Sequence, residues 1–148
     1  GGDLEMGVSH PDAPAMKQAR MFVYGLQHLI GIGQEEYDLE VNPDYPVLRL
    51  LKNIVRAQRG AARDFVVFGE MLRPARIKVA ATRVDLYRRP GTVEMPRVFH
   101  SRWRAPDGRV GHVLANWSGS AEEISLQMAG GWRELKVPAR DVMVVEER

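Results

Sequence analysis

The chain has 148 residues, of which 45% are hydrophobic and 27% charged, and its formal net charge is +2. This composition supports a folded core and excludes long disorder. The small net charge excludes a protein that binds polyanions through its overall charge. No apolar run approaches about 20 residues, which excludes a membrane-spanning helix. Cysteine is absent, which excludes disulfides, thiolate catalysis and cysteine-ligated zinc. We therefore expect a soluble protein with neither nucleic acid nor a membrane as partner.

Two amphipathic helices are predicted in the first half of the chain. Over 13–30, apolar side chains recur at the spacing of one helical face, and Gly31 marks the exit. An acidic loop over 35–40 follows, which could contact sugar hydroxyls or Ca²⁺ but is better explained as a solvated loop. The second helix, 46–67, has an apolar stripe on one side. Its opposite face carries basic side chains, interpreted as a solvated face: Arg49, Lys52, Arg56, Arg59 and Arg63.

After Pro74 the apolar side chains alternate with the period of a β-strand. About six short strands with turn signals between them predict a small antiparallel β-sandwich or open barrel. The segment 105–108 is a turn ending in glycine, and the strand at 110–117 has a mixed pattern that predicts burial on both faces. We therefore predict an α+β fold with a helical segment at 1–74 and an antiparallel β-sandwich at 75–148.

Two segments resemble a known group of proteins. The first is RDFVVFGEMLRP at 63–74, which joins the second helix to the β half, and the second is WRAPDGRVGHVLANW at 103–117. Together with the order of helices and strands, they resemble the C-terminal end of TIM-barrel glycoside hydrolases, of the α-galactosidase-like and related uncharacterised barrel families. The resemblance extends from about residue 20 to the end of the chain.

The resemblance implies that 1–74 is the end of a (β/α)8 barrel and that 75–148 is the C-terminal β-sandwich. The parent protein would hydrolyse glycosidic bonds, with a missing N-terminal barrel and, through it, carbohydrate as partners. Most catalytic barrel strands would lie outside this chain, so we expect the fragment itself to be inactive and to hold no cofactor or metal. The alternatives are a stand-alone carbohydrate-binding module and a protein-interaction domain without catalysis.

Asp3 and Glu5 are the weak catalytic candidates. The chain starts without a methionine or a signal peptide, so we expect the true N-terminus to be missing and these residues to be the stub of a late barrel strand. Two carboxyl groups at alternate positions of one strand lie about 7 Å apart, within the range used for glycoside hydrolysis. Catalytic pairs usually come from different strands, however, and a solvated chain end is the favoured explanation.

Trp117 is the weak candidate for carbohydrate binding, because aromatic faces stack on sugar rings and this tryptophan ends a strand just before small polar residues. Trp103 alternates in phase with apolar positions and should face the core, and Trp132 is the third tryptophan of the β half. Core packing is the favoured explanation for all three. His100 and His112 flank the 105–108 turn and should come close together, but without a nearby carboxylate they do not predict a metal site.

Overall fold

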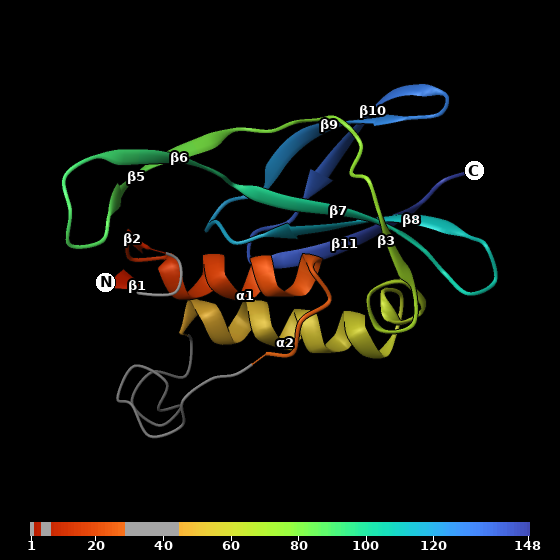
Figure 1. The fold of residues 1–148 in the computed structure, drawn as a ribbon, viewed down its shortest axis with the longest axis horizontal. Coiled ribbons are helices and arrows are strands. Elements are labelled where there is room, and N and C mark those ends of the chain that lie inside the picture. Colours follow the sequence, from red (N-terminus) through yellow and green to blue (C-terminus); the bar gives the residue numbers. More distant parts are fainter. Residues whose placement is uncertain (1, 4–6, 29–44) are drawn as a thin grey trace.

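The structure is a computed structural model that describes residues 2–3, 7–28 and 45–148. The helical elements are α1 (Ala13–Val23), α2 (Pro46–Arg59) and the π-helical turn η2 (Arg63–Val67). The strands are β1 (Gly2–Asp3), β2 (Val8–Ser9), β3 (Glu70–Leu72), β4 (Ile77–Lys78), β5 (Ala81–Leu86), β6 (Thr92–Pro96), β7 (Val98–Arg104), β8 (Val110–Asn116), β9 (Glu122–Met128), β10 (Gly131–Val137) and β11 (Asp141–Glu146). The strand pairs are antiparallel, and the predicted α+β class is confirmed (Figure 1).

The described residues contain eleven strands, more than the predicted number of about six. The first four strands of the chain, β1 to β4, are only two or three residues long. Alternation cannot be recognised over so few positions, because a strand pattern needs a run of about four or more. β2, β3 and β4 exist because they pair with segments distant in sequence, as β3 does with β7, whereas β1 pairs with the neighbouring β2.

Both helices are shorter than the sequence pattern predicted. α1 covers only the first part of 13–30, because Gly25 adopts a φ of 67°, a left-handed conformation that ends helices. The last two predicted positions, 29–30, lie outside the described residues. α2 covers only the first part of 46–67, because the helix stops at Gly60 and continues as the separate turn η2. Helical periodicity runs through both interruptions, and the sequence signal for the first is Gly25 itself, because glycine is unfavourable inside a helix.

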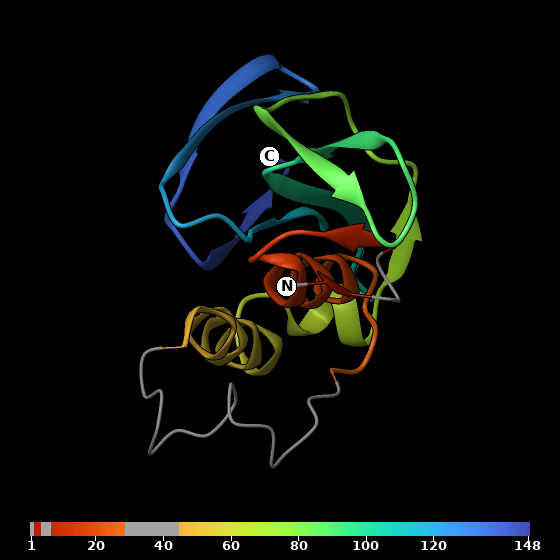
Figure 2. The same ribbon diagram turned by 90° about the vertical axis from the view of Figure 1, so that its left-hand side faces the viewer.

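The strands form three sheets. The central sheet has the order β11-β8-β7-β3, the outer sheet β10-β9-β4, and the side sheet β1-β2-β5-β6. Figure 2 shows α1 and α2 on one face of the central sheet and the outer sheet across its other face. The central sheet is therefore the middle layer of the molecule.

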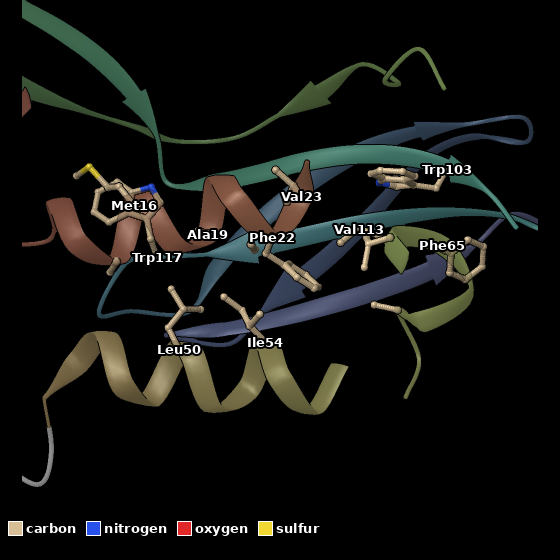
Figure 3. Close-up of a cluster of buried hydrophobic side chains, with 14 of the residues drawn as sticks. Met16, Ala19, Phe22, Val23, Leu50, Ile54, Phe65, Trp103, Val113 and Trp117 are labelled. Carbon is tan, nitrogen blue, oxygen red and sulfur yellow. The ribbon is translucent and has the colours of Figure 1, made fainter. Parts of the chain in front are cut away.

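Two clusters of buried side chains hold these layers together. The first lies between the helices and the central sheet, and its large members include Met16, Phe22, Leu50, Ile54, Phe65, Val113 and Trp117 (Figure 3). The second lies between the central and outer sheets and consists of Val98, Leu114, Ile124, Val137 and Val145, with partly buried neighbours. Val113 and Leu114 are adjacent in β8 but belong to different clusters, which confirms the predicted burial of this strand on both faces.

The helices and the β strands share the first cluster. In addition, β3 precedes the predicted boundary at residue 74 and pairs with β7 beyond it. The shared cluster means that each helix buries its apolar face against strands from the second half of the chain. The division of the chain into folding units at 1–74 and 75–148 stays a prediction.

Gly111 of β8 gives a test of the packing between the central sheet and η2. A Cβ atom at this position would lie 2.8 Å from two carbons of the Phe65 ring, which is fully buried. We expect Gly111→Ala to lower the free energy of unfolding by about 1–3 kcal/mol, the usual cost of overpacking a core. Urea denaturation followed by tryptophan fluorescence measures this. The matched control is Gly130→Ala, where a Cβ meets nothing within 4 Å, and equal losses in both variants would refute the packing argument.

Candidate functional site

The structure does not bring the candidates Asp3 and Glu5 into a described site. Asp3 lies in β1, whose backbone pairs with Val8 of β2. The side chain of Asp3, the whole of Glu5 and the acidic loop 35–40 lie outside the described residues. Catalysis by this pair of carboxyl groups therefore stays a prediction.

Trp117 is buried, which agrees with the favoured explanation of core packing and not with its candidacy as a carbohydrate-binding residue. Its exposed fraction is 2%, its Nε1 donates a hydrogen bond to the Pro96 carbonyl at 2.7 Å, and His10 contacts the ring edge-on at 5.8 Å between centroids. Figure 3 shows the indole beside Met16 of α1. The end of β8 is thus not a surface position, because α1 covers it, and no free indole face is left for a sugar to stack on.

Trp132 is the exposed tryptophan. Its exposed fraction is 43%, whereas Trp103 is buried as predicted. Trp132 lies near the start of β10, opposite Gln127, and β10 is an end strand of the outer sheet. The Lys78 ammonium is 4.3 Å from the centroid of its ring. The sequence signal for this position was its place directly after the two-glycine turn that leads into the strand.

His100 and His112 come together, as their positions about the turn predicted. His100 Nε2 is 3.0 Å from His112 Nδ1, and the rings are stacked with 5.2 Å between centroids. His112 Nε2 is 2.8 Å from Glu147 Oε1, and Arg102 donates hydrogen bonds of 2.8 and 3.1 Å to the same carboxylate. This carboxylate was missed in the sequence, because Glu147 follows the last strand, 35 residues beyond His112.

Burial and neighbouring charges set the protonation of this histidine cluster. Burial, followed by the charges of His112 and Arg102, lowers the pKa of His100 to about 4. Burial also lowers the pKa of His112, and the hydrogen bond from Arg102 lowers the pKa of Glu147. His112 has no exposed surface, so a substrate cannot reach it as a general base. The cluster is suited to fasten the chain after β11 to the central sheet.

A groove of about 740 Å³ lies where the segment after α2, η2, the β7–β8 turn, β10 and β11 meet. Its apolar lining includes Leu135 and Met143, and its charged lining consists of Asp64, Arg109, Arg133, Glu146 and Arg148. The volume lies within the range of about 300–1,000 Å³ typical of ligand sites. The groove is therefore a candidate binding site.

Arg109 organises one wall of this groove. Its guanidinium donates hydrogen bonds to Asp107 at 2.7 Å, to Glu146 at 2.7 Å and to Asp64 at 2.6 Å. These three carboxylates belong to the β7–β8 turn, to β11 and to η2, so a single side chain ties three elements together. The hydrogen bond from Arg109 lowers the pKa of Asp107, and the same bonds raise the pKa of Arg109.

A smaller recess of about 250 Å³ adjoins the groove. It shares Arg133, Glu146 and Arg148 with the groove and adds Trp132 and the Gly130–Gly131 turn. Because side chains alternate along β10, the Trp132 indole lies on the outer face of this sheet with Lys78, whereas Arg133 lies on the inner face that borders the groove.

A second surface feature is an apolar patch around Trp103. Gly25 is in close contact with Val66 and Trp103, since a Cβ atom there would lie 2.8 Å from the Val66 carbonyl and 3.0 Å from the indole. Met71 of β3 pairs directly with Trp103 of β7. The loop after α1, the turn η2 and β3 thus meet at one corner. The exposed members of this apolar patch are Tyr24, Leu26, Val67, Phe68 and Met71.

No protein-family model matches the sequence, and comparisons with curated proteins and with solved structures give no match. Among the described residues, no three His, Asp or Glu side chains are grouped so that they could hold a metal ion. In the same part of the chain, no helix is long and apolar enough to cross a membrane.

Proposed function

We propose that the chain is a non-catalytic accessory region of a glycoside hydrolase-like protein, in which it packs against a catalytic barrel and stabilises it. The β strands would form the C-terminal β-sandwich of that protein, and α1 and α2 would be its last barrel helices. Hydrolysis of glycosidic bonds would take place in the barrel. The observation that carries this proposal is the apolar patch, which lies beside the turn η2 between the helices and the sheets.

The apolar patch has the composition of a domain contact. Of eight large hydrophobic side chains that are exposed among the described residues, five belong to it. Phe68 is 56% exposed, although its neighbour Phe65 is fully buried. Contiguous exposed apolar surface is uncommon on single domains and marks contacts with other domains or proteins. The patch also borders β3, which is an end strand of the central sheet and has a free edge in the described sheets.

The carboxylates of the groove do not form a catalytic pair. Asp64 and Glu146 line it, but both accept short hydrogen bonds from Arg109. Hydrolysis requires one carboxylic acid that protonates the leaving group and a second carboxylate that acts as nucleophile or base. Two carboxylates held by one guanidinium tie the fold together, which supports an accessory role for this chain.

The test compares the isolated chain with the natural gene product that carries the proposed barrel. The double variant Phe68→Asp, Met71→Asp changes two exposed side chains, so the stability of the isolated chain should change by less than about 1 kcal/mol. In the full protein the same variant should lower the thermal inactivation midpoint by about 5 °C, as expected from a loss of about 2 kcal/mol at a domain contact.

The matched control is Val93→Asp, which alters an exposed apolar side chain of β6 outside the apolar patch. It should leave the inactivation midpoint of the full protein unchanged. Equal effects of the patch variant and the control would argue against docking through the apolar patch. Hydrolysis of oligosaccharides by the isolated chain would argue against a non-catalytic role.

A further inference from the structure

We infer that the free edge of β11 binds an extended acidic peptide, which adds to the central sheet as a further strand, with Arg133 as its charged contact. The central sheet has two end strands, and the other one, β3, borders the apolar patch. The inference therefore concerns the edge opposite the proposed barrel contact and does not depend on that contact. It is carried by the backbone of β11, by the shape of the groove and by the charges that line it.

The backbone of β11 has hydrogen-bonding groups that no described strand uses. In an antiparallel pair, successive residues point their N–H and C=O groups alternately towards the neighbouring strand and away from it. The Glu147 N–H donates to the Val110 carbonyl of β8 at 2.8 Å, and the pairing with β8 is continuous through β11. By alternation, the backbone groups of Val144 and Glu146 point away from β8. Because β11 is an end strand of the described sheet, these two residues present donors and acceptors to which an extended peptide can pair.

The groove runs along this edge of β11. Four consecutive residues of the strand, 143–146, line it, although consecutive side chains of a strand point to opposite faces of the sheet. Gly60 and Ala61 line it from the helical side, and Leu135 lines it from the outer sheet. β11 itself lies between the outer sheet and α2 (Figure 1). A strand-shaped ligand in this groove of about 740 Å³ therefore continues the central sheet between the two layers that cover it.

The charges of the groove select a peptide whose acidic and apolar side chains alternate. Arg133 and Arg148 line the groove and make no ion pair with any described residue. Arg133 lies on the inner face of β10, which borders the groove. On the side of η2, Asp64 and Glu146 are both bound to Arg109. A strand that turns acidic side chains towards Arg133 and apolar side chains towards η2 complements both sides.

A second copy of the chain fits this edge less well than an acidic peptide. Two β11 strands that paired about a twofold axis would form an isologous contact, in which both partners present the same surface. Each copy would then bring its own Arg133 and Arg148 to the interface. Like charges across an interface oppose association, so the charge of the groove favours a different, acidic segment as the added strand.

The experiment titrates the 148-residue chain with a synthetic peptide of about eight residues, the length of a strand, in which glutamate alternates with valine. Isothermal calorimetry at physiological salt gives the affinity, and NMR follows hydrogen exchange of the backbone amides. We expect saturable binding that slows exchange of the Val144 and Glu146 amides, whereas the Val145 amide, already paired with β8, changes little. Arg133→Glu should weaken binding about tenfold. The matched control Arg89→Glu alters an exposed arginine of the β5–β6 turn and should leave the affinity unchanged.

Control peptides separate strand addition from simple charge attraction. The same peptide with lysine in place of glutamate should not bind. Two further versions carry N-methyl groups on every second backbone amide, one in each frame, and keep the negative charges. One frame blocks the amides that face β11, so that version should bind about tenfold more weakly or not at all.

Several outcomes would overturn the inference. These are the absence of binding, equal affinity for the lysine peptide, unchanged affinity for both N-methylated versions, and equal weakening by Arg133→Glu and Arg89→Glu. Slow exchange of the Val144 and Glu146 amides without peptide would also overturn it, because the edge would then be covered already, and by a second copy if the protection rises with protein concentration. None of these results bears on docking through the apolar patch, so the inference can fail while the proposed accessory role stands.

Discussion

Replacement of Trp117 by alanine is expected to lower the free energy of unfolding by about 3–5 kcal/mol, the range for truncating a large buried aromatic side chain. The indole is buried in the cluster that joins α1 to the central sheet. Its removal leaves a cavity there and also deprives the Pro96 carbonyl of the hydrogen bond from Nε1. Urea denaturation followed by far-UV circular dichroism measures the change without depending on tryptophan fluorescence.

Two variants separate packing from the hydrogen bond. Trp117→Phe keeps an aromatic ring in the cavity but loses the Nε1 donor, so its loss of stability should fall between those of the wild type and Trp117→Ala. Trp132→Ala truncates the exposed indole and should cost far less, about 0.5 kcal/mol. If Trp117→Ala and Trp132→Ala destabilised the chain equally, the assignment of Trp117 to the core would be wrong.

This result also decides how sugar-binding data are to be read. A Trp117→Ala variant that loses binding would report the loss of folded protein, because the indole is buried in the cluster between α1 and the central sheet. The backbone carbonyl of Trp117 accepts a hydrogen bond from Arg140, which also donates one to Asp12 at 2.7 Å. The region around Trp117 connects the start of α1, the end of β8 and the turn before β11. Trp132 is the tryptophan that can test stacking on a ligand, since its indole is exposed and its truncation leaves the buried cluster intact.

The sequence pattern predicted those parts of the fold that depend on local repetition. The change from helical to strand period near Pro74 and the double burial of β8 both follow from which side chains are apolar. The helix ends were missed because Gly25 and Gly60 break the backbone without breaking the apolar stripe. The strands of two or three residues were missed because they are too short to show alternation, and because β2, β3 and β4 depend on partners that are distant in the chain.

The contacts of the candidate site likewise divide into those that the sequence predicts and those that depend on distant pairing. The nearness of His100 and His112 was predictable from the turn between β7 and β8. This turn sets a register that pairs Arg102 with His112 and His100 with Leu114, so the two histidines are diagonal neighbours on one face of the sheet. The contact of Glu147 with His112 was not predictable, since Glu147 comes close to the two histidines only because β11 pairs with β8. The groove likewise combines residues of η2, the β7–β8 turn, β10 and β11, and no short segment of the sequence contains its charge pattern.

The histidine cluster predicts a loss of stability on acidification. The pKa of His100 is lowered from 6.5 to about 4, first by burial and then by the charges of His112 and Arg102. Between these two values the unfolded chain holds a proton on this imidazole and the folded chain does not. The free energy of unfolding therefore falls as the pH is lowered from 6.5 to 4, by up to about 3 kcal/mol at 1.36 kcal/mol per pKa unit. Urea midpoints measured at several pH values in this interval give the slope.

Glu147 adds a second loss at lower pH. The hydrogen bond from Arg102 lowers its pKa below 4.5, so the stability that this carboxylate contributes is present above 4.5 and disappears as the pH falls through the lowered value. The variant His100→Gln removes one titrating group and should flatten the slope between pH 6.5 and 4 while the loss due to Glu147 persists. An unchanged slope in His100→Gln, or stability that rises on acidification, would show that the buried pair does not control the pH response.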